Sequence, residues 1–146
     1  MSIDKGQIDN DHKFLIGIIN DVQLIQRGPN LPKLVLEILA RLDVYASTHF
    51  EREERLQLAV VFPDADEHHQ HHADLMSQLD IMRSEWASAR APHDMVAFHA
   101  RLCDFLYHWL IDHILQHDLL MKPFVAEMRQ HAREITLDAA VAAKVG

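Results

Sequence analysis

The sequence is poor in residues that crosslink or interrupt a chain. Its single cysteine, Cys103, excludes an internal disulfide, and the apolar neighbours Leu102, Phe105 and Leu106 indicate a core residue in a reducing compartment. Only four Gly and five Pro occur in 146 residues, while Ala, Leu, Glu and Gln are abundant. This composition favours helices over sheet, so we expect an all-α protein. A chain of this length can bury its own core, which predicts a single domain.

Basic clusters and long apolar runs are also missing. The chain has 14 Lys and Arg against 22 Asp and Glu, a formal charge of −8, with no basic cluster longer than a pair. These features argue against nucleic acid as a partner. No window approaches the ~18 apolar residues of a membrane span, and MSIDKGQIDN lacks the apolar run of a signal peptide. We therefore expect a cytoplasmic protein without membrane insertion.

Apolar residues recur at helical spacing in four stretches separated by short breaks. The predicted helices cover about 9–27, 32–61, 64–89 and 93–121. Asp9 or Asn10 is the expected N-cap of the first, and Leu34 and Leu120 are expected to face inward from the second and fourth. Helices of these lengths with short connections predict an up-down-up-down antiparallel four-helix bundle. Its core would span about 8–122, and Pro123 would separate it from an extension over 123–146, a short helix or frayed tail.

Twelve histidines are many for this length, and several fall on predicted inward positions. His68 and His72 lie four residues apart in HHQHH, which puts both imidazoles on one helix face. The other inward polar residues are His12 near the start of the first helix, His49 and Glu53 near the end of the second, and His113 near the end of the fourth. In an alternating bundle all these positions lie at the same end, within roughly two helical turns of one another.

Five histidines and a carboxylate at one depth of a core predict a metal site, because buried polar groups need partners. Structural zinc would require only four ligands, usually including thiolates, and the chain has one cysteine. Mixed imidazole and carboxylate ligands suit iron or manganese, and helical bundles house two-metal carboxylate sites. We therefore expect a pair of metal ions.

The last ligand on the fourth helix is ambiguous from spacing alone. His117 follows His113 by four residues and is favoured by helical geometry, whereas Asp118 is rotated from His113 by about 140°. A pair of cations in a low-dielectric core needs anionic bridging groups, and this requirement favours Asp118. On these grounds both residues remain candidates.

Four segments carry a resemblance to a known family. They are IDNDHKFL around His12, HFEREE from His49, HHQHH from His68 and WLIDHILQHD ending at Asp118. In order and spacing the chain resembles the hemerythrins, most closely their single-domain bacterial members. Many relatives also carry a tryptophan-containing arm before the first helix, which this chain lacks.

The resemblance implies a non-haem di-iron centre with an oxo or hydroxo bridge. It makes Glu53 and Asp118 the carboxylates that bridge the two irons, and so favours Asp118 over His117. The implied terminal ligands are His68, His72 and His113 on one iron, and His12 and His49 on the other. The second iron would keep an open position for dioxygen. By resemblance we expect reversible oxygen carriage, storage or sensing, without enzymatic activity.

Apolar side chains occupy the matching family positions around this expected site and would keep water out. They are Leu15, Phe50, Trp109, Leu110 and Ile114. Leu110 is the expected gate, since a side chain one turn before His113 on the same face should overhang the site.

Two other functional classes compete with oxygen binding. One is a di-iron enzyme acting on peroxide, nitric oxide or ferrous iron, which would favour a wetter pocket with an additional acid–base group. The other is an interaction or signalling module. Expected partners besides dioxygen are an oxygen-consuming enzyme or a second copy of the chain, and the extension after Pro123 is a candidate contact surface.

Overall fold

Helices make up all the regular structure in the described ranges. The structure, a computed structural model, describes residues 2–25, 30–88 and 92–145. The α-helices are α1 (Gln7–Leu24), α2 (Leu31–Val60), α3 (Ala65–Ser88), α4 (Pro92–His108) and α5 (Lys122–Val145). Between α4 and α5 lie a π-helix, η1 (Trp109–Ile114), and a 3-10 helix, η2 (Asp118–Met121). The predicted all-α class is confirmed.

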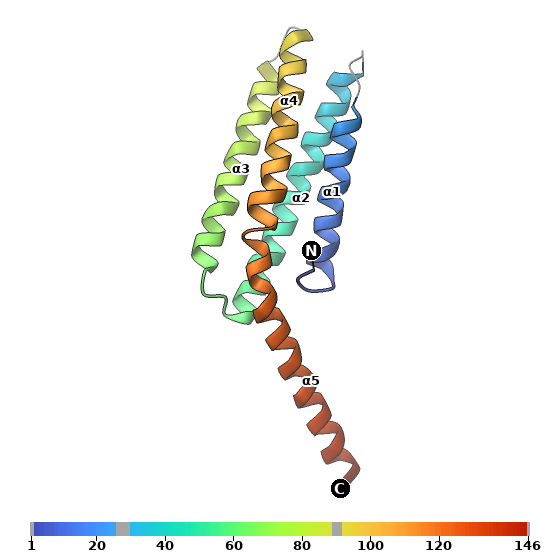
Figure 1. The fold of residues 1–146 in the computed structure, drawn as a ribbon, viewed down its shortest axis with the longest axis vertical. Coiled ribbons are helices and arrows are strands. Elements are labelled where there is room, and N and C mark those ends of the chain that lie inside the picture. The colour runs from blue at the N-terminus through green and yellow to red at the C-terminus, as the bar shows by residue number, and fades with distance from the viewer. Residues whose placement is uncertain (1, 26–29, 89–91, 146) are drawn as a thin grey trace.

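The first four helices lie side by side in alternating directions (Figure 1). α1 packs against α2 and α4, and α3 packs against the same two helices. The start of α1, the α2–α3 turn and the chain after α4 share one end of the bundle, which we call the α2–α3 end. The predicted antiparallel four-helix bundle is therefore confirmed.

The start of α1 differs from the prediction. Neither Asp9 nor Asn10 is the cap, because the helix already begins at Gln7. Asp4 instead accepts hydrogen bonds through Oδ1 from the backbone N–H groups of Gly6, at 2.8 Å, and of Asp9, at 3.2 Å. An acidic side chain just before a helix satisfies N–H groups that have no intrahelical acceptor.

Asp9 folds the N-terminal segment over the α2–α3 end. Its carboxylate accepts hydrogen bonds from the Ser2 hydroxyl and from the Ile3 backbone N–H, both at 2.7 Å. This places Ile3 in a small apolar cluster at that end. The buried members of this end cluster are Ile3, Ile8, Phe62, Met121 and Val125. The short N-terminal segment and the start of α5 thus cover this end of the bundle.

A larger apolar cluster fills the bundle beyond the end cluster. It contains residues from all four bundle helices, including Leu15, Leu42, Leu79 and Leu102, each 0% exposed. The seam on α3 follows the predicted spacing, with Leu79, Met82 and Trp86 buried. Leu34 on α2 is an exception, because it is 37% exposed and Val35 takes the inward position.

The predicted fourth helix is not continuous. α4 ends at His108, after which η1 makes wider turns with hydrogen bonds between residues five apart. Residues after a π-helical segment are rotated relative to their positions in an unbroken α-helix. Leu120, predicted to face inward, is therefore 51% exposed, and Met121 is buried in its place.

α5 is longer than the predicted short helix. It spans 24 residues, and Pro123 lies in its first turn, where a missing backbone N–H removes no intrahelical hydrogen bond. Pro123 therefore begins a new helix, which extends away from the bundle (Figure 1). In the described part of the chain, no helix combines the length and apolarity needed to cross a bilayer.

Candidate metal centre

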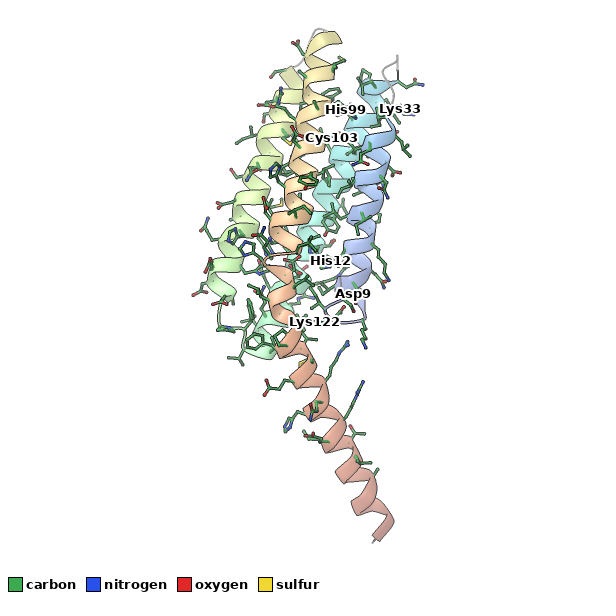
Figure 2. All side chains as sticks on the ribbon, viewed as in Figure 1. Asp9, His12, Lys33, His99, Cys103 and Lys122 are labelled. Atoms are coloured by element: carbon green, nitrogen blue, oxygen red, sulfur yellow. The ribbon has the colours of Figure 1, made fainter. Side chains whose placement is uncertain are left out.

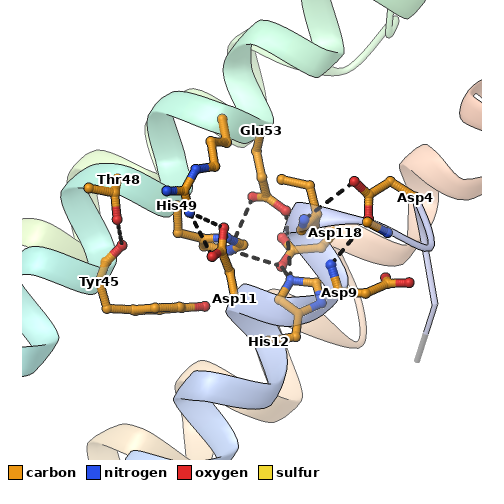
Figure 3. Close-up of polar contacts among 12 residues, drawn as sticks. Asp4, Asp9, Asp11, His12, Tyr45, Thr48, His49, Glu53 and Asp118 are labelled. Carbon is orange, nitrogen blue, oxygen red and sulfur yellow. Dashed lines mark hydrogen bonds and ion pairs between the residues drawn. The ribbon is translucent and has the colours of Figure 1, made fainter.

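Seven predicted site residues meet at the α2–α3 end of the bundle, between the two apolar clusters. Figure 2 marks the position of His12, and Figure 3 shows His12, His49, Glu53 and Asp118. The seven side chains come from α1, α2 and α3 and from both irregular segments that follow α4. The residues are His12 on α1, His49 and Glu53 on α2, His68 and His72 on α3, His113 on η1 and Asp118 on η2. Each of these seven residues is at most 3% exposed.

The carboxylate of Asp118 lies between two groups of imidazoles. Its Oδ2 is 3.1 Å from Nε2 of His12 and 3.8 Å from Nε2 of His49. Its Oδ1 is 3.3 Å from Nε2 of His68 and 3.2 Å from Nε2 of His113. Because each oxygen faces a different group, the carboxylate has the geometry of a ligand that bridges two ions.

Glu53 also faces both groups. Its Oε2 lies 3.3 Å from Nε2 of His72 and 3.4 Å from Nε2 of His68. Its Oε1 lies 3.8 Å from Nε2 of His12, while Oε2 is 3.6 Å from Nε2 of His49. The division is less even than at Asp118, since Oε2 approaches imidazoles of both groups.

Two sets of donor atoms are compact enough to hold one metal ion each. Within each set, one ligand atom per residue lies within 4.8 Å of all the others. The first set is Glu53, His68, His72 and His113, and the second is His12, His49, Glu53 and Asp118. Since ligand atoms sit about 2.0–2.2 Å from such an ion, each set can converge on one ion. Both clusters are able to bind metal.

Several buried atoms in these clusters have no hydrogen-bond partner among the described residues. They are Nε2 of His49, His68 and His113, Oε1 of Glu53 and Oδ1 of Asp118. Buried polar atoms are normally hydrogen-bonded, and leaving them without partners destabilises a fold. Metal ions would satisfy these atoms. The atoms belong to imidazole and carboxylate groups, which suit divalent transition metals.

The carboxylates govern the protonation of the imidazoles. Burial opposes the charged form of His49, but Glu53, Asp11 and Asp118 together outweigh it and raise the pKa of His49 to about 10. Asp118 and Glu53 outweigh burial at His68 and raise its pKa to about 9. At His113 burial prevails and lowers the pKa to about 3. Metal ions binding here would therefore displace protons from His49 and His68.

Glu54 supports His72 from outside the cluster, a role that the sequence analysis missed. Its Oε1 lies 3.1 Å from Nδ1 of His72 and 2.8 Å from Nδ1 of His69. A carboxylate on the remote nitrogen fixes the orientation of an imidazole ligand and increases its basicity. Glu54 directly follows Glu53, but it acts on α3, so sequence adjacency did not indicate its partner.

Asp11 has the corresponding position beside His49. Its Oδ2 lies 3.6 Å from Nδ1 of His49, an ion-pair distance. Arg52 holds this carboxylate through Nη1, at 2.6 Å from Oδ1 and 2.7 Å from Oδ2. Asp11 precedes His12 in the chain, yet it supports a ligand on the neighbouring helix.

Aromatic rings pack directly on the cluster. The ring of Phe50 stacks on His72, with centroids 3.8 Å apart and planes at 12°, and lies 5.7 Å from the ring of Trp109. Leu15, Trp109 and Ile114 are 0% exposed, and Phe50 is 5% exposed. Four of the five predicted lining residues are thus buried, and the ring of Phe50 packs on the imidazoles of His72 and His113. Their role as the lining of an oxygen pocket stays a prediction.

The remaining lining residue, Leu110, lies outside the described side chains. The structure adds Tyr45, a residue to which the sequence assigned no role in the site. Its ring stacks on His49, with centroids 4.9 Å apart and planes at 17°. Within the described ranges its buried hydroxyl has no hydrogen-bond partner.

The irregular backbone after α4 decides between His117 and Asp118 as the inward residue. His117 keeps an α-type hydrogen bond from its N–H to the His113 carbonyl, at 2.8 Å. Its ring nevertheless lies beside the cluster, with its centroid 6.3 Å from that of His113. Asp118, which begins η2, is 0% exposed and faces the imidazoles. The α-helical spacing that favoured His117 therefore does not hold here, and the residue that faces the imidazoles is Asp118, which the need for anionic groups and the family resemblance favoured.

A comparison with protein families agrees with this geometry. The family model described as the hemerythrin HHE cation binding domain matches residues 6–125. No curated protein and no solved structure matches the chain. The matched range covers most of the chain and includes every residue of the buried cluster, from His12 to Asp118. The chain belongs to the hemerythrin family.

Proposed function

We propose that this protein binds dioxygen reversibly at two iron ions held by the seven clustered side chains. The observation that carries the proposal is the unequal number of imidazoles in the two compact donor sets. One set contains His68, His72 and His113, whereas the other contains only His12 and His49. With three imidazoles on one side and two on the other, one ion would have a position free for a ligand. A bound iron pair would supply the redox couple and the free position that reversible oxygen binding requires.

The surrounding residues support binding in a dry pocket. Phe50 packs against the imidazoles of His72 and His113, Trp109 packs against Phe50, and the end cluster covers the α2–α3 end. Excluding water protects a reduced metal pair from irreversible oxidation. Asp11 and Glu54 lie beside the remote nitrogens of His49 and His72, where they orient imidazoles.

A di-iron enzyme acting on peroxide, nitric oxide or ferrous iron is the second candidate, and Tyr45 favours it. Its phenol is buried against His49 without a hydrogen-bond partner among the described residues. Burial and the nearby carboxylates raise the pKa of Tyr45 well above its usual value, so it stays protonated at neutral pH. A protonated phenol beside a redox centre can supply the proton that reductive chemistry consumes.

Anaerobic loading with ferrous iron, followed by cycles of oxygen and argon, separates the two functions. Oxygen binding predicts two irons per chain and a visible absorption band that appears and disappears over repeated cycles. A single irreversible oxidation with continued peroxide consumption would reject oxygen binding and favour the enzyme. His68→Ala should lose iron. His131→Ala, on an exposed position of α5, is the matched control and should keep it.

A further inference from the structure

A surface cleft lies beside the buried cluster, between α3 and the chain from α4 to His117. Its volume is about 350 Å³. The lining relevant here consists of the exposed or half-exposed residues His71, Asp74, Asp112 and His117, and of the buried residues Trp109 and His113. Because His113 belongs to the buried cluster, the cleft brings solvent-facing groups close to the candidate metal centre.

Imidazole rings form a path from solvent to the buried cluster. The side chain of His71 is 39% exposed, and its ring centroid lies 3.9 Å from that of the half-buried His117. The centroid of His117 lies 6.3 Å from that of His113 and 6.4 Å from that of His68. His113 and His68 are each 3% exposed. The path therefore leads from an accessible imidazole to two residues of the centre.

The acidic groups of the cleft favour a cation. Asp74 on α3 and Asp112 on η1 line it from opposite sides. The Gln70 amide donates to Oδ1 of Asp74 at 3.0 Å, and the Gln116 amide donates to Oδ1 of Asp112 at 3.4 Å. Each carboxylate thus keeps a second oxygen for another partner. The adjacent imidazoles of His71 and His117 match the ligand preferences of first-row divalent transition metals, and the two carboxylates add negative charge that attracts a cation to the cleft.

We propose that His71 and His117, assisted by Asp74 and Asp112, capture a divalent transition-metal ion and pass it to the buried centre. The capture step is independent of the proposed function. The transfer step rests on it, because the buried metal centre is the destination of the ion. A hydrated cation is costly to bring to residues that are at most 3% exposed. At the cleft, imidazoles can replace some of its water while the ion is still near solvent. Transfer inward then favours the buried centre, which offers more ligands.

The capture step is tested with Cu²⁺ added to the iron-loaded protein, because imidazole nitrogens bound to copper are visible by electron paramagnetic resonance. We expect a copper signal with nitrogen ligands in the natural chain and in the His131→Gln control. His71→Gln combined with His117→Gln should weaken Cu²⁺ binding by at least about tenfold. Undiminished binding in this double variant would overturn the proposal.

The transfer step is tested by the rate at which the metal-free protein takes up Fe²⁺. We expect the double variant to load more slowly than the control, with the same final iron content. Asp74→Asn with Asp112→Asn changes only exposed positions, so it provides a second test if His117→Gln disturbs the fold. An unchanged loading rate in folded variants would overturn the transfer role. The copper signal reports on the cleft separately from oxygen binding, so failure of either proposal can be recognised.

Discussion

Nε2 of His12 and Oδ2 of Asp118 lie 3.1 Å apart, although 106 residues of chain separate them. This buried contact joins the first turns of α1 to η2, the segment between the bundle and α5. It closes the polar cluster opposite α3, where His68 faces the other oxygen of Asp118 and His72 faces the carboxylate of Glu53.

Asp118→Asn should remove metal, whereas His117→Gln should leave the buried metal content unchanged. The amide keeps the size of the side chain but loses the negative charge that faces both imidazole groups. Metal per chain after loading and desalting measures the difference. If the His117 variant were the one to lose buried metal, the inward assignment of Asp118 would be incorrect.

Glu54→Gln should weaken metal binding by about 10- to 100-fold without removing a ligand, because it removes the carboxylate beside Nδ1 of His72. Competition with a chelator measures the affinity. Glu51→Gln is the matched control, since Glu51 lies exposed on the same helix and pairs with Arg55. Equal affinities in the two variants would argue against a supporting role for Glu54.

The metal-free protein should lose stability as the pH rises above neutrality. An unfolded histidine titrates near 6.5, whereas the pKa of His49 is raised to about 10 and that of His68 to about 9. The folded state therefore binds these protons more tightly. The resulting stabilisation is fully present below pH 6.5 and is lost as the pH rises through 9 and 10. The pKa of His113 is lowered to about 3, so for this residue the unfolded state binds the proton more tightly. His113 therefore reduces the stability of the folded state only as the pH falls below about 6.5.

Thermal unfolding after chelation, at pH 6.5 and 9.5, measures this effect. We expect the melting temperature to fall by about 5 °C or more. The metal-loaded protein should lack this decrease, because bound ions replace the protons. A melting temperature of the metal-free protein that is constant or rises over this range would contradict the protonation pattern.

Phe50→Ala should destabilise the protein by about 3–5 kcal/mol, because it leaves a cavity against His72 and Trp109. It should also speed irreversible oxidation of the iron-loaded protein by admitting water. Denaturant unfolding and the decay of the oxygen-dependent absorption measure the two effects. Phe14→Ala, at a position 48% exposed on α1, should change both much less. Equal effects at the two positions would remove the pocket role of Phe50.

Much of the fold could be predicted because helical periodicity is a local property. The spacing of apolar residues located the four bundle helices. Because consecutive helices run in alternating directions, the start of one helix was correctly expected to lie beside the end of the next. The predicted boundaries were less accurate where one side chain decides them. Asp4 begins α1 before the expected caps, and α5, with Pro123 in its first turn, is longer than the short helix or frayed tail that was expected.

The sequence by itself determined that six polar residues face the core at one end of a bundle, because each lies on the inward stripe of a predicted helix. These residues are His12, His49, Glu53, His68, His72 and His113. Helical spacing and charge left both Asp118 and His117 open, and the family resemblance favoured Asp118, but only the tertiary structure gives the physical reason why Asp118 faces the cluster. The π-helical turns of η1 change the register, and α-helical spacing cannot predict such a change. Only the packing of neighbouring helices could bring Asp11 to His49 and Glu54 to His72, since these contacts depend on side chains meeting across helices.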